Sequence, residues 1–193
     1  MDLHKIGIKF FAGEGSNTEL VDFIPVFHRW IQKKLIDQLL LDVADYSHIQ
    51  DGPGIVLVAH EGNYAVDETG GHRGMVYYSK HRLPAGNLVG RLCDVAAKSL
   101  KACQLLESDE EFKNKISFPG NELEIFSNDR LLAPNTEETW NSLQPEIKKF
   151  LEKLLPGQDY SLERTPDPKE RFQLTIKTAK PVTVNTLLQN ISG

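Results

Sequence analysis

Residues 55–67 read IVLVAHEGNYAVD and give the strongest strand signal in the chain. The first five residues are apolar on both faces and the rest are mixed, as in a strand that is buried within a sheet. The glycine-rich residues 68–74 (ETGGHRG) follow, and residues 75–80 read as a strand again. Glycine and polar residues between two strand patterns indicate a hairpin. Because a hairpin joins antiparallel strands, a wholly parallel sheet is not expected.

Periodicity predicts the other elements on either side of this hairpin. Further strands are expected at residues 5–12, 122–126, 160–164 and 172–178, and helices at residues 20–31, 87–106, 136–155 and 182–191. Because proline is tolerated only in a first turn, Pro25 places the start of the first regular helix near Asp22, and Pro145 should kink or restart the third. Ser16 and Glu19 have the spacing of a capping box before the first helix. Residues 39–49 (LLLDVADYSHI) fit either a continued helix or a strand, and we prefer the strand.

This order of elements indicates an α+β protein, with residues 1–193 forming one domain. We expect an antiparallel or mixed sheet with helices mainly on one face. The first part fits a ferredoxin-like βαββαβ core, and an α-β-β-α extension would follow it at the C-terminal end.

Composition excludes several classes of function. The chain has 27 acidic and 22 basic residues and a net charge of −5, which argues against a nucleic-acid partner. The first residues, MDLHKI, do not resemble an export signal, and no apolar run is long enough to cross a membrane. Cys93 and Cys103 fall in one helical segment, roughly 15 Å apart along its axis, and cannot bridge each other there. We therefore expect a cytoplasmic protein with free thiols and no membrane partner.

The stretch from His28 to His81 holds the side chains from which acid–base and metal sites are built. The candidates are His28, Asp42, Asp45, His48, His60, Glu61, Asp67, His72 and His81. Neighbouring residues of a strand point to opposite faces, so His60 and Glu61 should not meet at one metal ion. The sequence lacks H-E-x-x-H, and it lacks any nucleotide-binding motif.

Two interpretations stay open for most of these residues. His60 is either a half-buried core histidine or a group that points into a pocket with His48 or His28. If residues 39–49 are helical, Asp42, Asp45 and His48 share one helix face and could form a carboxylate–imidazole relay. If these residues form a strand, Asp45 and His48 are turn and cap residues. The hairpin tip with His72 and Arg73 is either exposed or able to close over an anionic ligand.

Four segments of the chain resemble a group of uncharacterised bacterial proteins over roughly the first 80 residues. They are VFHRWIQ (residues 26–32), DVADYSH (residues 42–48), DGPG (residues 51–54) and the dipeptide HE (residues 60–61). The resemblance implies a bacterial cytosolic protein. It implies no activity, ligand or catalytic residue.

Two hypotheses of function follow from the sequence. The first is a small-ligand-binding or regulatory protein that forms a homodimer or other homo-oligomer, with ligand contacts from Trp30, Tyr64, His72 and Arg73. The second is a metal-assisted or acid–base enzyme of hydrolase type. Its candidate catalytic residues are His28, Asp45, His48, His60 and Glu61, and a divalent metal would be held by His28, His48 and His60.

Overall fold

The computed structural model of the chain describes residues 1, 3–16, 18–84, 86–165 and 167–192. Within these residues the strands are β1 (Ile6–Phe11), β2 (Leu40–Tyr46), β3 (Gly54–Ala59), β4 (Gly62–Asp67), β5 (Gly74–Ser79), β6 (Glu122–Ser127), β7 (Tyr160–Glu163) and β8 (Gln173–Thr178). The α-helices are α1 (Phe23–Lys33), α2 (Leu88–Ser108), α3 (Glu137–Leu154) and α4 (Val184–Ile191), and the short 3-10 helices are η1 (Leu20–Asp22) and η2 (Thr69–Gly71).

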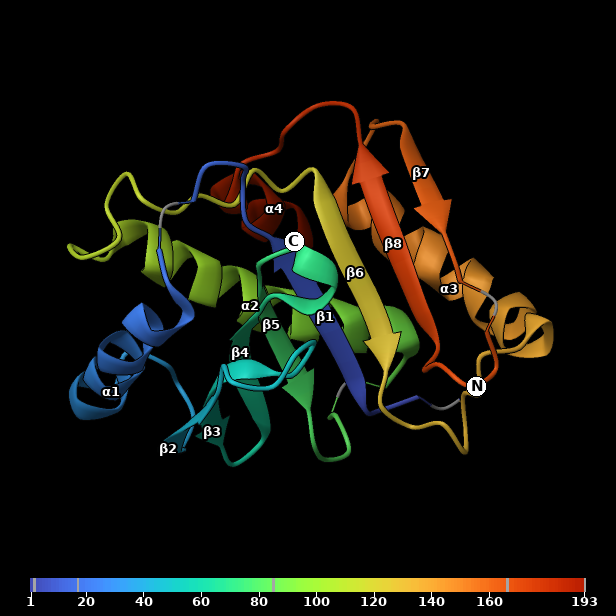
Figure 1. Cartoon of the computed structure of the whole chain (residues 1–193). Coiled ribbons are helices and arrows are strands. Elements are labelled where there is room, and N and C mark those ends of the chain that lie inside the picture. The colour runs from blue at the N-terminus through green and yellow to red at the C-terminus, as the bar shows by residue number, and fades with distance from the viewer. Residues whose placement is uncertain (2, 17, 85, 166, 193) are drawn as a thin grey trace.

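The strands form one antiparallel sheet in the order β2-β3-β4-β5-β1-β6-β8-β7. Figure 1 shows the α-helices behind or beside this sheet, and among the described residues no α-helix lies on the face towards the viewer. Helix α2 packs on β1 and β5, α3 and α4 pack against α2, and α1 lies against β2. The α+β class and the placement of the helices on one face, both predicted from the sequence, are confirmed.

The large core lies between the sheet and the helices, because alternate residues of each strand point to that side. In β1 these are Ile6, Ile8 and Phe10, which are fully buried. A second, much smaller apolar cluster lies on the other side of the sheet and is formed by Val56, Ala65, Val76 and Phe126.

Residues 55–67 do not form one strand, contrary to the prediction. They fold into β3 and β4, which pair with each other through Ile55 and Val66 and through Leu57 and Tyr64. The chain reverses between the two strands at residues 60–61. One strand over the whole stretch would be roughly 43 Å long, far beyond a typical strand. The hairpin instead places one apolar set from both halves, Ile55, Leu57, Tyr64 and Val66, in the core under the helices.

The other local predictions are mostly confirmed. Residues 68–73 form the hairpin loop between β4 and β5, with Gly74 already in β5, and residues 39–49 contain strand β2, so the helical alternative is wrong. Helix α1 begins directly after Asp22, and Pro25 lies in its first turn. The predicted capping box is wrong, because Ser16 donates to the carbonyl oxygen of Gly13 and Glu19 forms a capping box with Asp22.

Helix α3 continues through Pro145, where a kink or restart was predicted. The ferredoxin-like core is not confirmed, because four strands lie between α1 and α2 where that core has two. The segment between the strands predicted at residues 160–164 and 172–178 includes residue 166, which lies outside the described residues.

Two further observations concern the environment of the chain. Across the described residues, no helix combines the length and the apolar character needed to cross a membrane. Cys93 and Cys103 are both free thiols in α2, and Cys103 is buried. The prediction that they do not bridge each other is confirmed.

Candidate functional site on the uncovered sheet face

The three histidines predicted to hold a metal lie on separate elements. His28 is exposed on α1, His48 is exposed in the turn before β3, and His60 is exposed in the turn after it. His48 and His60 therefore lie beyond opposite ends of β3, a strand roughly 20 Å long. The ring of His60 lies near His81 instead, with 5.6 Å between the ring centroids.

The two candidate carboxylates have local partners. The Asp45 carboxylate accepts hydrogen bonds from the Ser47 hydroxyl at 2.6 Å and the Ser47 backbone N–H at 2.9 Å. These bonds, the hydroxyl first, lower the pKa of Asp45. This is the turn-and-cap role that was predicted for Asp45 if residues 39–49 form a strand. The Glu61 carboxylate lies 3.2 Å from the ammonium of Lys98 on α2.

No metal centre is assembled from these groups. In the part of the chain that the structure describes, no three His, Cys, Asp or Glu side chains are placed to hold a metal ion. His28, His48 and His60, the predicted metal ligands, do not form such a group.

Two of the aromatic residues predicted to contact a ligand belong to the core. Trp30 is fully buried and its ring centroid lies 5.1 Å from that of Phe27. Tyr64 is 2% exposed and stacks against Tyr77 under the helices, with 4.7 Å between centroids. Neither side chain presents its ring to solvent.

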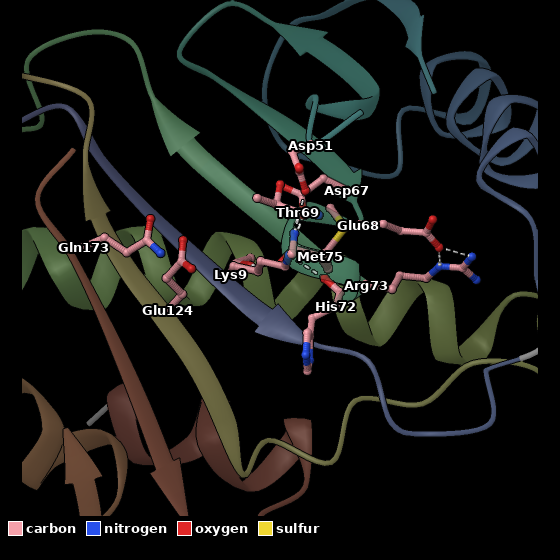
Figure 2. Close-up of polar contacts among 12 residues, drawn as sticks. Lys9, Asp51, Asp67, Glu68, Thr69, His72, Arg73, Met75, Glu124 and Gln173 are labelled. Atoms are coloured by element: carbon pink, nitrogen blue, oxygen red, sulfur yellow. Dashed lines mark hydrogen bonds and ion pairs between the residues drawn. The ribbon is translucent and has the colours of Figure 1, made fainter. Parts of the chain in front are cut away.

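The hairpin tip between β4 and β5 is held by the protein itself. Arg73 donates to the Glu68 carboxylate at 2.8 Å and also binds the hydroxyl and carbonyl oxygens of Thr18. His72 is exposed and meets the ring of Phe11 edge-on at 6.1 Å between centroids. Figure 2 shows Arg73 directed towards Glu68. Arg73 is therefore engaged, rather than free to close over an anion.

The structure draws attention to a different place, the sheet face that no helix covers. Lys9 of β1 and Glu124 of β6 lie directly opposite each other on this face. Both are charged residues, yet Lys9 is only 2% exposed and Glu124 only 8%. Lysine and glutamate are rarely buried unless they are paired, so their partners define the site.

Lys9 is paired with Asp67 at the end of β4. Its ammonium lies 2.5 Å from the Asp67 carboxylate and donates to the carbonyl oxygen of His72 at 2.7 Å. Figure 2 shows this side chain reaching along the sheet to Asp67. It can do so because Gly74 has no side chain: a Cβ there would lie 2.4 Å from Cε of Lys9.

Glu124 is paired with Arg171, which precedes β8. Arg171 donates to the Glu124 carboxylate at 3.0 Å and to the Gln173 side chain at 3.1 Å. Its guanidinium carbon lies over the ring of Phe126, 3.6 Å from the centroid. Burial raises the pKa of Glu124, and the positive charges of Arg171 and Lys9 oppose this rise.

Phe126 itself lies flat on the sheet. A Cβ at Gly7 would come within 2.0 Å of the ring, so only glycine allows this close approach on β1. The ring is therefore packed between the backbone at Gly7 and the guanidinium of Arg171. Long side chains laid along the sheet take the place of a covering helix.

A cavity of about 570 Å³, which we call the sheet-face cavity, opens on this surface. Its floor is formed by Ala65, Val76, Tyr78 and Phe126. Its rim carries carboxylates and guanidiniums from turns at both ends of the strands, namely Asp51, Asp67, Glu170, Arg130 and Arg171. An apolar floor with a few polar groups around it can bind the flat or aliphatic body of a ligand and orient its polar edge.

Sequence reasoning missed Lys9, Glu124 and Arg171, although alternation carried part of the signal. In both KIGIKFF and ELEIFS the charged residue shares a face with other polar residues, glycine or phenylalanine. That pattern separates the two faces but does not show that the polar one is buried.

Comparison of the chain with family models, curated proteins and solved structures finds no match.

Proposed function

We propose that this protein binds a small organic molecule in the sheet-face cavity, as a ligand-binding or regulatory protein. The observation that carries the proposal is the burial of Lys9 and Glu124, each with an ionic partner, beside an apolar floor on a face without a covering layer. The uncovered face of an antiparallel sheet is ordinarily exposed and polar when it has only a structural role.

The size and chemistry of the cavity support this proposal. Its volume of about 570 Å³ lies within the range of known ligand pockets, roughly 300–1,000 Å³. The rim has both signs of charge, so it favours a ligand that is neutral overall or zwitterionic. The Arg171 guanidinium, which covers Phe126 on one side, offers a flat surface on which a planar ring can stack.

The charged groups support binding better than catalysis. Lys9 and Asp67 are held by each other, and Arg171 holds Glu124. A general base or nucleophile needs a group that is free to accept a proton or attack a substrate. Here each pair serves to position the walls of the cavity.

Filling the cavity tests the proposal. Ala65 lies on the floor, and Ala65→Trp would place an indole where the ligand body lies. Saturation-transfer NMR with a mixed set of aromatic and aliphatic metabolite-sized compounds should find binders to the natural chain. These compounds should bind Ala65→Trp at least tenfold more weakly.

The matched control introduces tryptophan elsewhere. Leu131 is 96% exposed and does not line the cavity, so Leu131→Trp should leave binding unchanged. Circular dichroism would show that both variants are folded. The proposal fails if no compound binds the natural chain at millimolar concentration, or if binders bind Ala65→Trp as well as the natural chain.

We also propose a cytoplasmic location and a homo-oligomeric state. The free thiols of Cys93 and Cys103 support a reducing compartment. Light scattering of the purified chain would test the oligomeric state.

A further inference from the structure

The two edges of the sheet differ in length and composition. Strand β7, at one edge, has four residues, and its exposed side chains are the polar Ser161 and Glu163. Strand β2, at the other edge, has seven residues and contains no lysine, arginine or proline. Figure 1 shows β2 as the outermost strand on its side of the sheet. Edge strands are usually short or carry such residues, because an open edge pairs readily with another chain. Strand β2 lacks this protection.

Apolar side chains are exposed along β2 and the segments that flank it. Among the described residues nine large apolar side chains are exposed, and five of them lie within residues 35–49. We call these five the β2 edge patch; they are Leu35, Leu39, Leu41, Tyr46 and Ile49. A concentration of exposed apolar side chains at one place marks a surface that contacts another molecule.

The backbone of β2 directs hydrogen-bonding groups away from the sheet. The Val43 N–H donates to the carboxylate of the preceding Asp42 at 2.8 Å, so it is not used in pairing with β3. In an antiparallel pair, alternate residues direct both backbone groups to the same side, which places those of Val43 and Asp45 at the open edge. The Asp42 carboxylate thus takes the position of an acceptor that a further strand would supply.

We propose that β2 pairs with β2 of a second copy of this chain, antiparallel and around a two-fold axis at Val43, so that the two sheets become continuous. A two-fold axis makes one surface its own partner, which is the commonest arrangement in soluble oligomers. The inference rests on the homo-oligomeric state proposed above and names its interface. It does not depend on ligand binding in the sheet-face cavity.

Charge selects the register of this pairing. An axis at Asp42 or at Asp45 would place two carboxylates directly opposite each other, which destabilises a pair of strands. An axis at Ala44 would set Val43 opposite the charged Asp45. An axis at Val43, the middle residue of β2, lets the pairing extend over the length of the strand. It sets Val43 against its own copy and Asp42 against Ala44 of the second copy.

The size of the edge sets the expected affinity. Its seven residues span roughly 24 Å, and α1 lies against β2 on the covered face, so the edge is two layers, or roughly 20 Å, deep. Pairing would therefore bury roughly 500 Å² on each copy, at the lower end of specific interfaces. We expect a dimer that dissociates in the micromolar range of concentration.

Opposite charges at one position test the register. Ala44→Lys would place an ammonium opposite the Asp42 carboxylate of the second copy, and Ala44→Glu would place a carboxylate there. Ala44 pairs with Val56, on the uncovered face, and does not line the sheet-face cavity. Sedimentation velocity over a wide range of concentration should show the natural chain passing from monomer to dimer. The dissociation constant should rise at least tenfold for Ala44→Glu and should not rise for Ala44→Lys.

The other edge of the sheet provides the matched controls. Ser161 is exposed in β7, so Ser161→Lys and Ser161→Glu introduce the same charges at an edge where no pairing is proposed. Neither substitution should change the dissociation constant. Circular dichroism would show that all four variants are folded.

Hydrogen exchange of the natural chain provides a test without substitutions. The outward amides of Val43 and Asp45 gain partners in the dimer, so their exchange should slow at least tenfold between dilute and concentrated protein. Exchange of the Ser161 amide in β7 should be the same at both concentrations. Exchange at Val43 and Asp45 that does not depend on concentration would contradict the pairing.

Three results of sedimentation would overturn the inference. If the natural chain is a monomer at every concentration, the inference and the proposed homo-oligomeric state both fail, and the edge is left for an extended segment of another protein. If neither Ala44 variant changes the dimer, the homo-oligomeric state stands but its interface lies elsewhere. Equal weakening by Ala44→Lys and Ala44→Glu would show apolar association without this register. Ligand binding at the sheet-face cavity would be unaffected by any of these results.

Discussion

The two faces of the sheet are both buried at their centre, but by different means. On one face β1 presents Ile6, Ile8 and Phe10 to the helices, and a second layer of structure excludes water. On the other face the same strand presents Gly7 and Lys9, with no helix above them. There, Lys9 reaches along the sheet to Asp67, and the guanidinium of Arg171 lies over the ring of Phe126.

This difference shows what each face can do. The covered face is a core of interlocking apolar side chains, which resists change because its volume is filled. The uncovered face carries charged side chains beside an apolar floor, and the sheet-face cavity opens there. A cavity that opens on the surface can admit a ligand without unfolding of the domain.

The largest expected effect compares two phenylalanines. Phe10→Ala removes a ring from the covered face, where no side chain can refill the space, and should lower the free energy of unfolding by about 3–5 kcal/mol. Phe126→Ala removes the same atoms from the uncovered face, where water and Arg171 can enter. Its cost should be about 1.5–3 kcal/mol.

Urea unfolding followed by circular dichroism would measure both losses, with the slope of the transition as a check on two-state behaviour. Equal losses would contradict the distinction between the faces. They would indicate that another molecule or chain covers the second face in solution.

The next effect concerns the buried ion pair. Asp67→Ala leaves the Lys9 ammonium with the His72 carbonyl oxygen but without its carboxylate, and should destabilise the protein by about 3 kcal/mol. Adding Lys9→Met removes the unpaired charge, so the double variant should regain most of this loss. The free energies of unfolding of the natural chain, both single variants and the double variant measure the coupling.

An exposed pair provides the control for this experiment. Glu146 and Lys149 are 2.7 Å apart on the surface of α3, and Glu146→Ala should cost less than about 1 kcal/mol. A similar small cost for Asp67→Ala would mean that Lys9 swings out into water, and the uncovered face would then be far more open than described.

The smallest effect is a pH dependence due to Glu124. Burial raises the folded-state pKa of Glu124 above its ordinary value of 4.5, so the folded state holds this proton more tightly than the unfolded state. The contribution of Glu124 to stability is therefore largest below 4.5 and declines as the pH rises through the folded-state pKa. One proton can change the free energy of unfolding by no more than about 1.4 kcal/mol per pH unit.

Glu124→Gln cannot titrate and isolates this contribution. Urea unfolding of both chains between about pH 4 and pH 7 should show the natural chain losing stability relative to Glu124→Gln as the pH rises. If the natural chain instead becomes more stable relative to Glu124→Gln over the same range, attraction by Arg171 and Lys9 outweighs the effect of burial on Glu124.

Local signals in the sequence predicted much of this fold. Glycines in residues 68–74 indicated a hairpin, and apolar periodicity indicated α2 and α3, because both signals depend on neighbours along the chain. The turn at His60 and Glu61 was missed for the opposite reason. It has no Asn-Gly or Asp-Gly signature, and the reversal is fixed by the pairing of β3 with β4.

The candidate site could be predicted far less well. The sequence favoured the histidines because of their chemistry, and the structure disperses His28, His48 and His60 over separate elements. Lys9, Asp67, Glu124 and Arg171 are ordinary surface residue types in the sequence. Their pairing depends on strands β1, β4, β6 and the residue before β8 becoming neighbours across the sheet.

The sequence by itself determined the α+β class, the antiparallel hairpin after β4, most helices and the alternation that gives each strand two unlike faces. These properties follow from interactions over a few residues and from the period of the backbone. Only the tertiary structure decided which face the helices cover and which charged side chains are buried on the other. Burial is a property of the assembled sheet, because a lysine in β1 loses its water only when Gly74, Asp67 and Glu124 arrive beside it from distant parts of the chain.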